Sequence, residues 1–359
     1  MIDDIAMEIF NHLPFYDMIG FSLLNKRIYK LSFNHLNYQV FKNNLTKITC
    51  GSYYSMIIKH NHLYSFGAYS AGQLINANMI HYKPHLISKN VISVSAGARH
   101  ALFLTSIGLY GIGSNAHGQL GVKENDYTTP VLIPIEEVIS FSCGGTHSIV
   151  MTKQGLYGFG NNMVGQLVFS EMIVHKPTFI PFEHQVLQVA CGYSHTVFRT
   201  KHHIYVYGNH ALTWEHCDPI KVACGFDFTL ILLNDGVYGY GGNRNGQLSH
   251  NDGKPTKILE DVIDMTCGDH HCLFLKKDGL YVTGSNYYGE LSLQDKHDQH
   301  VPTKIKLNPL SFAGGDGHTI IKDKDHYYTF GSNRYSQLGL GKYKNKKYRI
   351  PQRITFEDR

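Results

Sequence analysis

The chain lacks the long hydrophobic runs that a membrane-spanning protein needs. None of its apolar stretches approaches the roughly 20 residues that cross a bilayer as a helix. The N-terminus carries the acidic pair Asp3-Asp4, where a secretory signal would be basic. We therefore expect no membrane partner and an intracellular location, in the cytoplasm or the nucleus.

Patterns that carry catalysis or hold a metal are also absent from the sequence. One off-repeat group of histidine and cysteine, His210, His216, Cys217 and Cys224, lacks the two-residue spacing of a zinc knuckle. No Ser/His/Asp arrangement or pair of carboxylates stands out, and phrases such as Gly111-Ile112-Gly113 lie between strands, where no helix can receive a phosphate. The sequence thus predicts a protein that is not an enzyme and has neither cofactor nor metal.

What the chain does contain is a repeat, typified by Cys143-Gly144-Gly145-Thr146-His147, then Gly155-Leu156-Tyr157-Gly158-Phe159-Gly160, then Gly165-Gln166-Leu167. The first glycine recurs at Gly51, Gly97, Gly144, Gly192, Gly225, Gly268 and Gly315. Self-similarity at this period is typical of propellers, solenoids and arrays.

Each unit contains about four short β-rich runs punctuated by Gly, Asn and Asp, with no helical period. In the third unit these runs are 138–143, 148–152, 156–159 and 177–181. Seven such units predict a mainly β protein, a seven-bladed β-propeller of four-stranded blades spanning residues 45–359. We expect the Asn-x-x-Gly turn to need positive φ, the next Leu to pack between blades, and the Gln amide to bond a neighbour's backbone.

A histidine also recurs, and in two units an aromatic residue replaces it, which favours a role in filling space and satisfying backbone groups. These positions are His100, His147, His195, His271 and His318, with Tyr54 and Phe228 in the other two units. Five of the seven cysteines share one repeat position (Cys50, Cys143, Cys191, Cys224 and Cys267). Equivalent positions belong to different blades and cannot form disulfides, so a reducing, intracellular environment is expected.

The phrase resembles the regulator-of-chromosome-condensation repeat, and the likeness covers about 315 residues. The fourth unit departs from it: it is short and reads 209–216 where the turn phrase belongs, which leaves open whether this blade keeps four strands. The resemblance implies a Ran-type exchange factor or chromatin-associated regulator as one alternative. However, no interval between repeat glycines exceeds 48 residues, so no inserted wedge is available.

Residues 1–44 have a different period, with apolar positions at helical spacing, which predicts a small N-terminal α-helical domain. Their order resembles an F-box, which in its family docks a Skp-type adaptor of a cullin-RING ubiquitin ligase. The resemblance implies adaptor contacts at Ile5, Ile9, Leu13, Pro14, Met18, Leu24, Asn25, Tyr29 and Phe41. The family's opening Leu-Pro falls on Met1-Ile2, and the alternative is a helical cap on the first blade. F-box and propeller together resemble chains of protists and giant DNA viruses.

The sequence therefore predicts an F-box adaptor that brings a protein substrate, held by the propeller, to the ligase. Substrate contacts are expected where the repeat is broken, at Leu212, Trp214, Glu215 and His216, which include the only Trp. The alternative is that Trp214 only fills the gap left by the missing turn. Residues 342–359 hold seven basic and two acidic side chains. They are expected to form a solvated loop ahead of a closing strand at 351–356, with nucleic-acid binding as the alternative. A plain scaffold is the third possibility.

Overall fold

The computed structural model describes residues 47–68, 80–123, 126–250, 253–341 and 346–356. They form seven four-stranded antiparallel sheets, each made of four consecutive strands. The first four blades contain β1 (Ile48–Cys50), β2 (Tyr54–Lys59), β3 (His62–Gly67), β4 (His81–Ser88); β5 (Val91–Ala96), β6 (His100–Thr105), β7 (Gly108–Gly113), β8 (Tyr127–Leu132); β9 (Val138–Cys143), β10 (His147–Thr152), β11 (Leu156–Asn161), β12 (Ile173–Ile180); and β13 (Gln188–Cys191), β14 (His195–Arg199), β15 (Ile204–Gly208), β16 (Leu212–Trp214).

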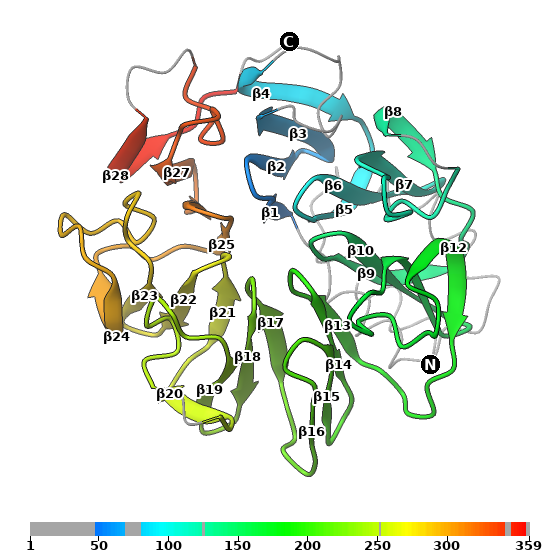
Figure 1. The fold of residues 1–359 in the computed structure, drawn as a ribbon. Helices are drawn as coiled ribbons and strands as arrows, with labels where there is room; N and C mark the ends of the chain where they lie inside the picture. The colour runs from blue at the N-terminus through cyan, green and yellow to red at the C-terminus, as the bar shows by residue number, and fades with distance from the viewer. Residues whose placement is uncertain (1–46, 69–79, 124–125, 251–252, 342–345, 357–359) are drawn as a thin grey trace, which may run out of the picture.

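The last three blades contain β17 (Lys221–Cys224), β18 (Phe228–Leu233), β19 (Gly236–Gly241), β20 (Thr256–Leu259); β21 (Asp264–Cys267), β22 (His271–Lys276), β23 (Gly279–Gly284), β24 (Gln299–Ile305); and β25 (Ser311–Gly314), β26 (His318–Lys322), β27 (Tyr327–Ser332), β28 (Lys347–Arg353). The blades are arranged in a ring, with the first strand of each nearest the centre and the fourth at the rim (Figure 1). The predicted seven-bladed propeller is thereby confirmed. In the described part of the chain, no helix is long and apolar enough to cross a bilayer.

Two sequence-based boundaries need correction, and one open question is answered. The fourth strand of blade 3 begins at Ile173, earlier than predicted, because it pairs with the whole length of β11. The closing strand of blade 7 runs from Lys347 to Arg353 and not over 351–356, so the basic residues Lys347 and Arg349 lie in a strand and not in a solvated loop ahead of it. Blade 4 keeps four strands, although β16 has only three residues.

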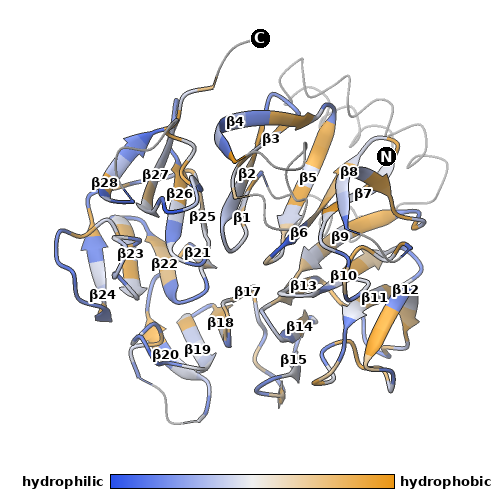
Figure 2. Cartoon of the chain, turned by 45° about the horizontal axis from the view of Figure 1, so that its top comes forward, coloured by the Kyte–Doolittle hydropathy of each residue, from blue (hydrophilic) through white to orange (hydrophobic). Residues whose placement is uncertain are grey.

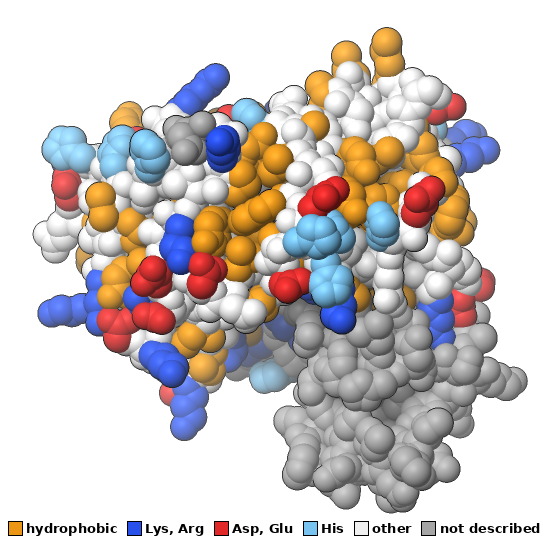
Figure 3. Space-filling view, turned by 90° about the horizontal axis from the view of Figure 1, so that it is seen from below, with side chains coloured by type: hydrophobic (Ala, Val, Ile, Leu, Met, Phe, Trp, Pro, Cys, Tyr) orange, Lys and Arg blue, Asp and Glu red, His pale blue; other side chains and the backbone are white. Residues whose placement is uncertain are grey.

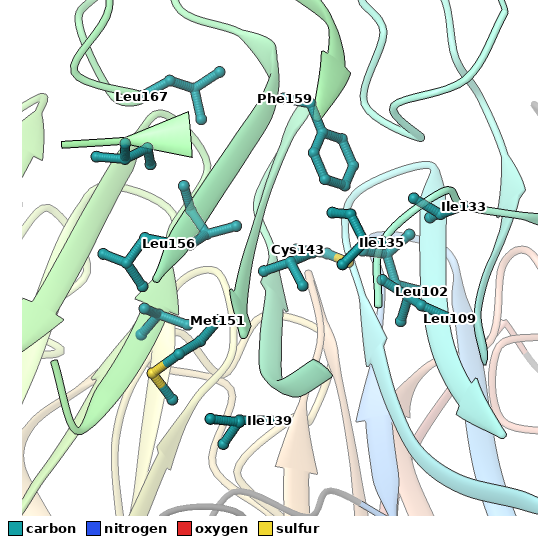
Figure 4. Packing of buried hydrophobic residues seen from close by; sticks show 14 of the residues in the cluster. Leu102, Leu109, Ile133, Ile135, Ile139, Cys143, Met151, Leu156, Phe159 and Leu167 are labelled. Carbon is teal, nitrogen blue, oxygen red and sulfur yellow. The ribbon is translucent and has the colours of Figure 1, made fainter. Parts of the chain in front are cut away.

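The middle strands of each blade provide the hydrophobic core. All six residues of β6 and of β10 are buried, whereas the rim strands β24 and β28 are mostly accessible and largely hydrophilic (Figure 2). Side chains of adjacent blades meet in continuous clusters, such as the one where Leu102 and Ile133 of blade 2 pack near Cys143 and Phe159 of blade 3 (Figure 4). The core therefore lies between blades as well as within them.

The Asn-x-x-Gly-Gln-Leu turn has a defined role in this packing. Gly118, Gly165 and Gly246 adopt φ between +72° and +81°, as predicted, and the leucines that follow are fully buried. The Asn side chain accepts a hydrogen bond from the Leu backbone, as in Leu167 N to Asn162 Oδ1 at 2.7 Å. The expectation for the Gln amide was wrong: its oxygen accepts from its own turn, and in several blades the Gln main-chain carbonyl is the group that meets the next blade.

The recurring histidine bonds to a hydroxyl of the next blade, so its partner is a side chain and not the backbone group that was expected. Its Nε2 lies 2.8–3.1 Å from a Ser or Thr oxygen in the second strand of that blade. The pairs are His100–Ser148, His147–Thr196, His195–Thr229, His271–Thr319 and His318–Ser55. Where this hydroxyl donates to the carbonyl of the turn, as Ser148 does to Gln119 at 2.8 Å, it must accept from an Nε2–H. The Nδ1 atoms of all five imidazoles are buried without a hydrogen-bond partner, and burial lowers their pKa well below 6.5, so these imidazoles are neutral at pH 7.

The two blades without the histidine also lack the hydroxyl in the next blade. Tyr54 stands opposite Ala101, and its own hydroxyl lies 3.1 Å from the carbonyl oxygen of Gly97. Phe228 stands opposite Cys272, so this interface is apolar. The repeat glycine makes room for all of these rings, because a Cβ at Gly144 would lie 2.2 Å from Cε1 of His147. Replacement of the histidine in one blade is thus accompanied by replacement of the hydroxyl residue in the next blade.

The ring closes by the same type of contact, between the first and last blades. Ser55 accepts from His318 and donates to the carbonyl of Gln337 at 2.9 Å. Phe356, which follows the last strand, places its ring 5.2 Å from Tyr64 and 5.5 Å from Tyr327. In the described residues each blade is continuous in sequence, so closure depends on packing between blades and not on a shared sheet.

The histidine links predict acid sensitivity. Burial lowers the pKa of His100, His147, His271 and His318 to about 3 and that of His195 to about 4. In the unfolded chain a histidine titrates near pH 6.5, so between these values the unfolded state binds more protons and stability falls as the pH falls. Each histidine contributes up to about 1.4 kcal/mol per pH unit, so the five give roughly 7 kcal/mol per unit as an upper limit. We expect unfolding with a midpoint between about pH 4 and pH 6, followed by circular dichroism.

A double variant provides the control. His147→Phe with Thr196→Cys copies the Phe228–Cys272 interface, removes one titrating group and should lower the acid midpoint. An unfolding free energy that stays constant between pH 7 and pH 4.5 would contradict the role given to the histidines.

Candidate protein-binding face

The loops between first and second strands and the turns between third and fourth strands emerge on one side of the ring. In every blade a backbone hydrogen bond joins them, such as Ser114 N to Arg99 O at 2.8 Å and Ser332 N to Gly317 O at 2.7 Å. We call this side the loop face. Its centre is formed by the two residues after each repeat glycine: Ser52-Tyr53, Ala98-Arg99, Gly145-Thr146, Tyr193-Ser194, Phe226-Asp227, Asp269-His270 and Asp316-Gly317.

Backbone hydrogen bonds also connect these loops from one blade to the next. Tyr193 N donates to Phe226 O, Phe226 N to Asp269 O, and Asp269 N to Gly315 O, each at 3.0 Å. The backbone of these loops is therefore fixed before a partner binds, and it holds the side chains of the loop face in position. Such fixed groups lose little conformational entropy when a partner binds.

Blades 4 and 5 place aromatic rings at these positions. The rings of Tyr193 and Phe226 stack with centroids 4.3 Å apart, and the ring of His270 in blade 6 follows 5.4 Å from that of Phe226. Tyr193 remains exposed, while Phe226 and His270 are partly buried. The three rings form a continuous aromatic arc of the kind that protein interfaces favour.

Blades 6 and 7 place carboxylates at the same position. Burial, and secondarily the neighbouring Asp316, raises the pKa of Asp269 to about 7, and burial also raises the pKa of Asp316. Neither carboxylate has an ion pair with another described residue. A desolvated carboxylate without a cation is stabilised by any positive group that approaches it.

A second group of aromatic side chains surrounds this acidic pair. Tyr53 and Tyr335 lie 4.6 Å apart, Arg334 stacks on Tyr335 at 5.7 Å, and Tyr287 is 64% exposed beside Tyr288. Tyr, Trp and Arg are the side chains that most often dominate binding energy at interfaces. The loop face therefore combines aromatic anchors with two desolvated carboxylates, beside the cations Arg99 and Arg334.

The centre of the ring contains a channel of about 460 Å³, lined by the first strands of all seven blades. Five free thiols lie along it, those of the repeat cysteines. Burial raises the pKa of Cys50, Cys143 and Cys191 to about 12, so these thiols stay protonated and are poor nucleophiles and metal ligands.

The structure divides the predicted substrate contacts into two pairs. Leu212 and Trp214 lie in β16, half-buried against the core of blades 4 and 5, and the Trp214 ring meets Tyr238 edge-on at 5.4 Å. Glu215 and His216 follow in an exposed loop. Their role in substrate binding stays a prediction. The nine predicted adaptor contacts, from Ile5 to Phe41, lie outside the described residues.

The basic C-terminal segment is partly committed to packing. Arg349 donates to the main-chain carbonyls of Asn286, Tyr287 and Asp295 in blade 6, at 2.9–3.2 Å. Lys347 lies over the ring of Tyr287 at 5.1 Å. These two cations therefore join blade 7 to blade 6 and are less available to a nucleic acid than the sequence indicates.

Family models of the "Regulator of chromosome condensation (RCC1) repeat" match this chain repeatedly. One model matches residues 108–151, 154–199, 277–321 and 324–359, and a second matches 91–119, 220–247 and 262–290. Together these ranges cover well over half of the sequence. The chain belongs to the RCC1 repeat family. The unmatched residues 200–219 coincide with the third and fourth strands of the divergent blade 4.

Solved structures confirm the RCC1-type propeller. The crystal structure of human WBSCR16 is 22% identical and superimposes with a TM-score of 0.70 over 82% of this chain and 93% of that chain. Prp20p from Saccharomyces cerevisiae is 19% identical, with a TM-score of 0.73 over 90% of each chain. Yeast RCC1 (Prp20) bound to Kap60 gives 0.74 over 89% and 87%, again at 19% identity. At these identities the likeness establishes the fold alone. A search of curated proteins found no significant relative.

Comparison of the RCC1 repeats with one another reveals the loop-face residues that the sequence prediction missed. The prediction sought selectivity only where a whole unit is broken, in blade 4. The two positions after the repeat glycine vary in every unit, with Tyr, Phe or Asp where blade 3 has Gly145. The variation of these two positions, between repeat residues that stay constant, could have identified the loop face from the sequence.

The structure also brings together three side chains of the kind that bind metal ions, which their spacing in the sequence did not reveal. His203, Glu215 and His216 bring one ligand atom each to within 4.8 Å of one another. His216 belonged to the group considered from the sequence, but His210 and Cys224 are not part of this one. His203 comes from the preceding turn, which only the antiparallel pairing of β15 with β16 brings near.

Asp269 gives a testable electrostatic prediction. Its folded pKa of about 7 exceeds the value near 3.9 of an unfolded aspartate, so the folded state binds more protons between these values and stability falls as the pH rises through them. Asp269→Asn should remove this cost and raise the unfolding free energy by up to about 4 kcal/mol at pH 8 and by less at pH 5, with solvent screening of the partly exposed carboxylate reducing both gains. Urea unfolding of both proteins at the two pH values measures the difference. Equal stability at pH 8 would show that the carboxylate is not desolvated.

Proposed function

We propose that the protein is a non-catalytic adaptor whose propeller recognises a protein partner through the loop face. The observation that supports this most is the juxtaposition of the aromatic arc Tyr193–Phe226–His270 with the desolvated pair Asp269 and Asp316. A pair of partly buried carboxylates with raised pKa values destabilises the isolated propeller at neutral pH and is compensated when a cation binds. Charged groups that lower the stability of the free protein, as this pair does, are often found at binding sites.

The partner's chemistry follows from this arrangement. A lysine or arginine of the partner would reach Asp269 and Asp316, while flanking apolar side chains contact Tyr193 and Phe226. Arginine fits best, because its guanidinium can both pair with a carboxylate and stack on a ring. The partner segment is therefore expected to be basic with adjacent apolar residues.

The second part of the proposal concerns residues 1–44, which resemble an F-box. We infer that this segment docks a Skp-type adaptor and so connects the captured partner to a cullin-RING ubiquitin ligase inside the cell. Only Asn43-Asn44 separate it from the propeller by sequence. A linker this short holds the captured protein at a restricted position, which favours modification of particular lysines.

A second candidate function is regulation of a Ran-type small GTPase or association with chromatin. It is supported by the RCC1 repeats and by the similarity in fold to Prp20p, whose structure was reported together with its binding to Gsp1p and histones. The regular repeat spacing, which leaves no inserted wedge, favours the adaptor. A plain scaffold would use the same face without the ligase.

Two matched variants separate the parts of the adaptor proposal. Leu13→Ala with Leu24→Ala should abolish capture of Skp and cullin subunits and leave the propeller's thermal transition unchanged, because these are apolar anchors of a separate module. Tyr193→Ala with Phe226→Ala should retain Skp and cullin but lose the substrate. Affinity purification with quantitative mass spectrometry measures both losses in one experiment.

The outcomes distinguish the alternatives. Retention of Skp by the Leu13/Leu24 variant, or its absence from the wild-type sample, would refute the F-box assignment. A substrate set unchanged by the Tyr193/Phe226 variant would refute the loop face as the recognition surface.

A nucleotide-release assay addresses the second candidate. Purified protein at micromolar concentration should leave the rate of fluorescent GDP release from Ran unchanged. A robust concentration-dependent acceleration would replace the adaptor proposal with exchange activity.

A further inference from the structure

Histidine and carboxylate side chains gather at the edge of blade 4, away from the loop face. Figure 3 looks onto the lower rim of Figure 1, where β16 lies, and shows several histidines beside acidic side chains. Along the chain, His203 precedes β15, and Glu215 and His216 follow β16. Their ligand atoms lie within 4.8 Å of one another, and the rings of His203 and His216 are 5.2 Å apart.

The backbones that carry these residues are tied to each other. Thr200 and His203 exchange hydrogen bonds across a tight turn, with His203 N to Thr200 Oγ1 at 3.0 Å. Cys217 N donates to His202 O at 3.0 Å, which joins the two segments directly. The group is thus positioned by the blade's own strand pairing and not by chance contact of long side chains.

Two residues of the second segment adopt an unusual conformation. His216 has φ of 53° and Asp218 has φ of 45°, in the left-handed region that side chains other than Gly enter at a cost. Asp218 in turn pairs with Nδ1 of His202 at 2.5 Å. The loop is therefore held in a shape that keeps Glu215 and His216 beside the preceding turn.

Within the described residues, the three side chains are not engaged in hydrogen bonds, although the Asp218 carboxylate interacts electrostatically with His216. None of them forms a hydrogen bond or ion pair with another residue in the part of the chain that the structure describes, although His203 is half-buried. The ring of His184 stacks over Tyr205 at 5.5 Å and lies 6.2 Å from that of His203, which limits the tilt of the His203 ring. Two imidazoles and a carboxylate thus converge with their ligand atoms available.

We propose that His203, Glu215 and His216 form a binding site for a divalent transition-metal ion of the zinc class. Two imidazole nitrogens and one carboxylate oxygen are a ligand set that Zn²⁺ uses when it keeps a further position open. Nitrogen ligands disfavour Mg²⁺ and Ca²⁺, which prefer oxygen. Ligand bonds of about 2.0–2.2 Å require the atoms to approach somewhat closer than 4.8 Å, which rotation of the exposed Glu215 and His216 side chains achieves.

The site keeps its remaining coordination position open to solvent. Glu215 and His216 are both exposed, so water or a side chain of a bound protein can complete the coordination. The site lies on the rim formed by the divergent blade, and within the described residues blade 4 is where two histidines and a carboxylate come within ligand distance of one another. The metal would therefore give blade 4 a contact point independent of the loop face.

Zinc titration of the full-length protein tests the proposal. Competition with a zinc-sensitive dye at pH 7.5 should show one Zn²⁺ that wild type binds and that Glu215→Gln and His216→Ala each bind about 100-fold more weakly. Binding should also weaken at pH 5.5, because histidine ligates only in its neutral form. Zn²⁺ should raise the thermal midpoint of wild type but not of either variant.

Two control variants make the result specific to this site. His297→Ala removes an exposed histidine beside Asp295 in blade 6, and Cys217→Ser removes the nearest thiol; both should bind Zn²⁺ as wild type does. Equal affinity of wild type, Glu215→Gln and His216→Ala would overturn the proposal, whether the protein binds zinc elsewhere or not at all.

Discussion

Burial of a neutral imidazole between neighbouring blades is the contact on which the rest of the propeller depends. Each histidine bonds to a hydroxyl of the next blade, and where this hydroxyl donates to the carbonyl of the turn, as in His100–Ser148–Gln119, the imidazole is the donor. One short chain of hydrogen bonds therefore fixes a second strand and the third–fourth turn across an interface. Where the hydroxyl is missing, opposite Tyr54 and Phe228, the interface is completed by a larger ring instead.

This constraint separates the residues that build the ring from those that can vary. The repeat glycine, the histidine and the Gly-Gln-Leu turn are committed to contacts between blades. The two positions after the glycine are held in place by backbone hydrogen bonds, so their side chains are not needed for the contacts between blades. Tyr193, Phe226 and Asp269 can therefore differ from blade to blade without loss of the fold, and a binding surface can arise there.

The sequence predicted the blade number, the four-stranded units and the buried turn leucines, because all depend on local periods that repeat. The sequence-based predictions failed for features that depend on contacts between strands or blades far apart in the chain. The partner of His147 is Thr196, 49 positions away. The extent of β28 is set by pairing with β27, and the approach of His203 to His216 follows from the pairing of β15 with β16. The aromatic and acidic residues of the loop face were missed because a recurring position was taken as architecture throughout.

Site-specific photo-crosslinking in cells tests the central claim, that the loop face recognises a protein. A photoreactive residue replaces Tyr193, Phe226 or Tyr287 on the loop face, or Asp235, Asp261 or Asp278 in turns on the opposite side of blades 5 and 6. The account predicts one and the same covalent partner from the three loop-face positions and none from the three opposite ones. Adducts only from the opposite side, or none from positions 193 and 226, would contradict it.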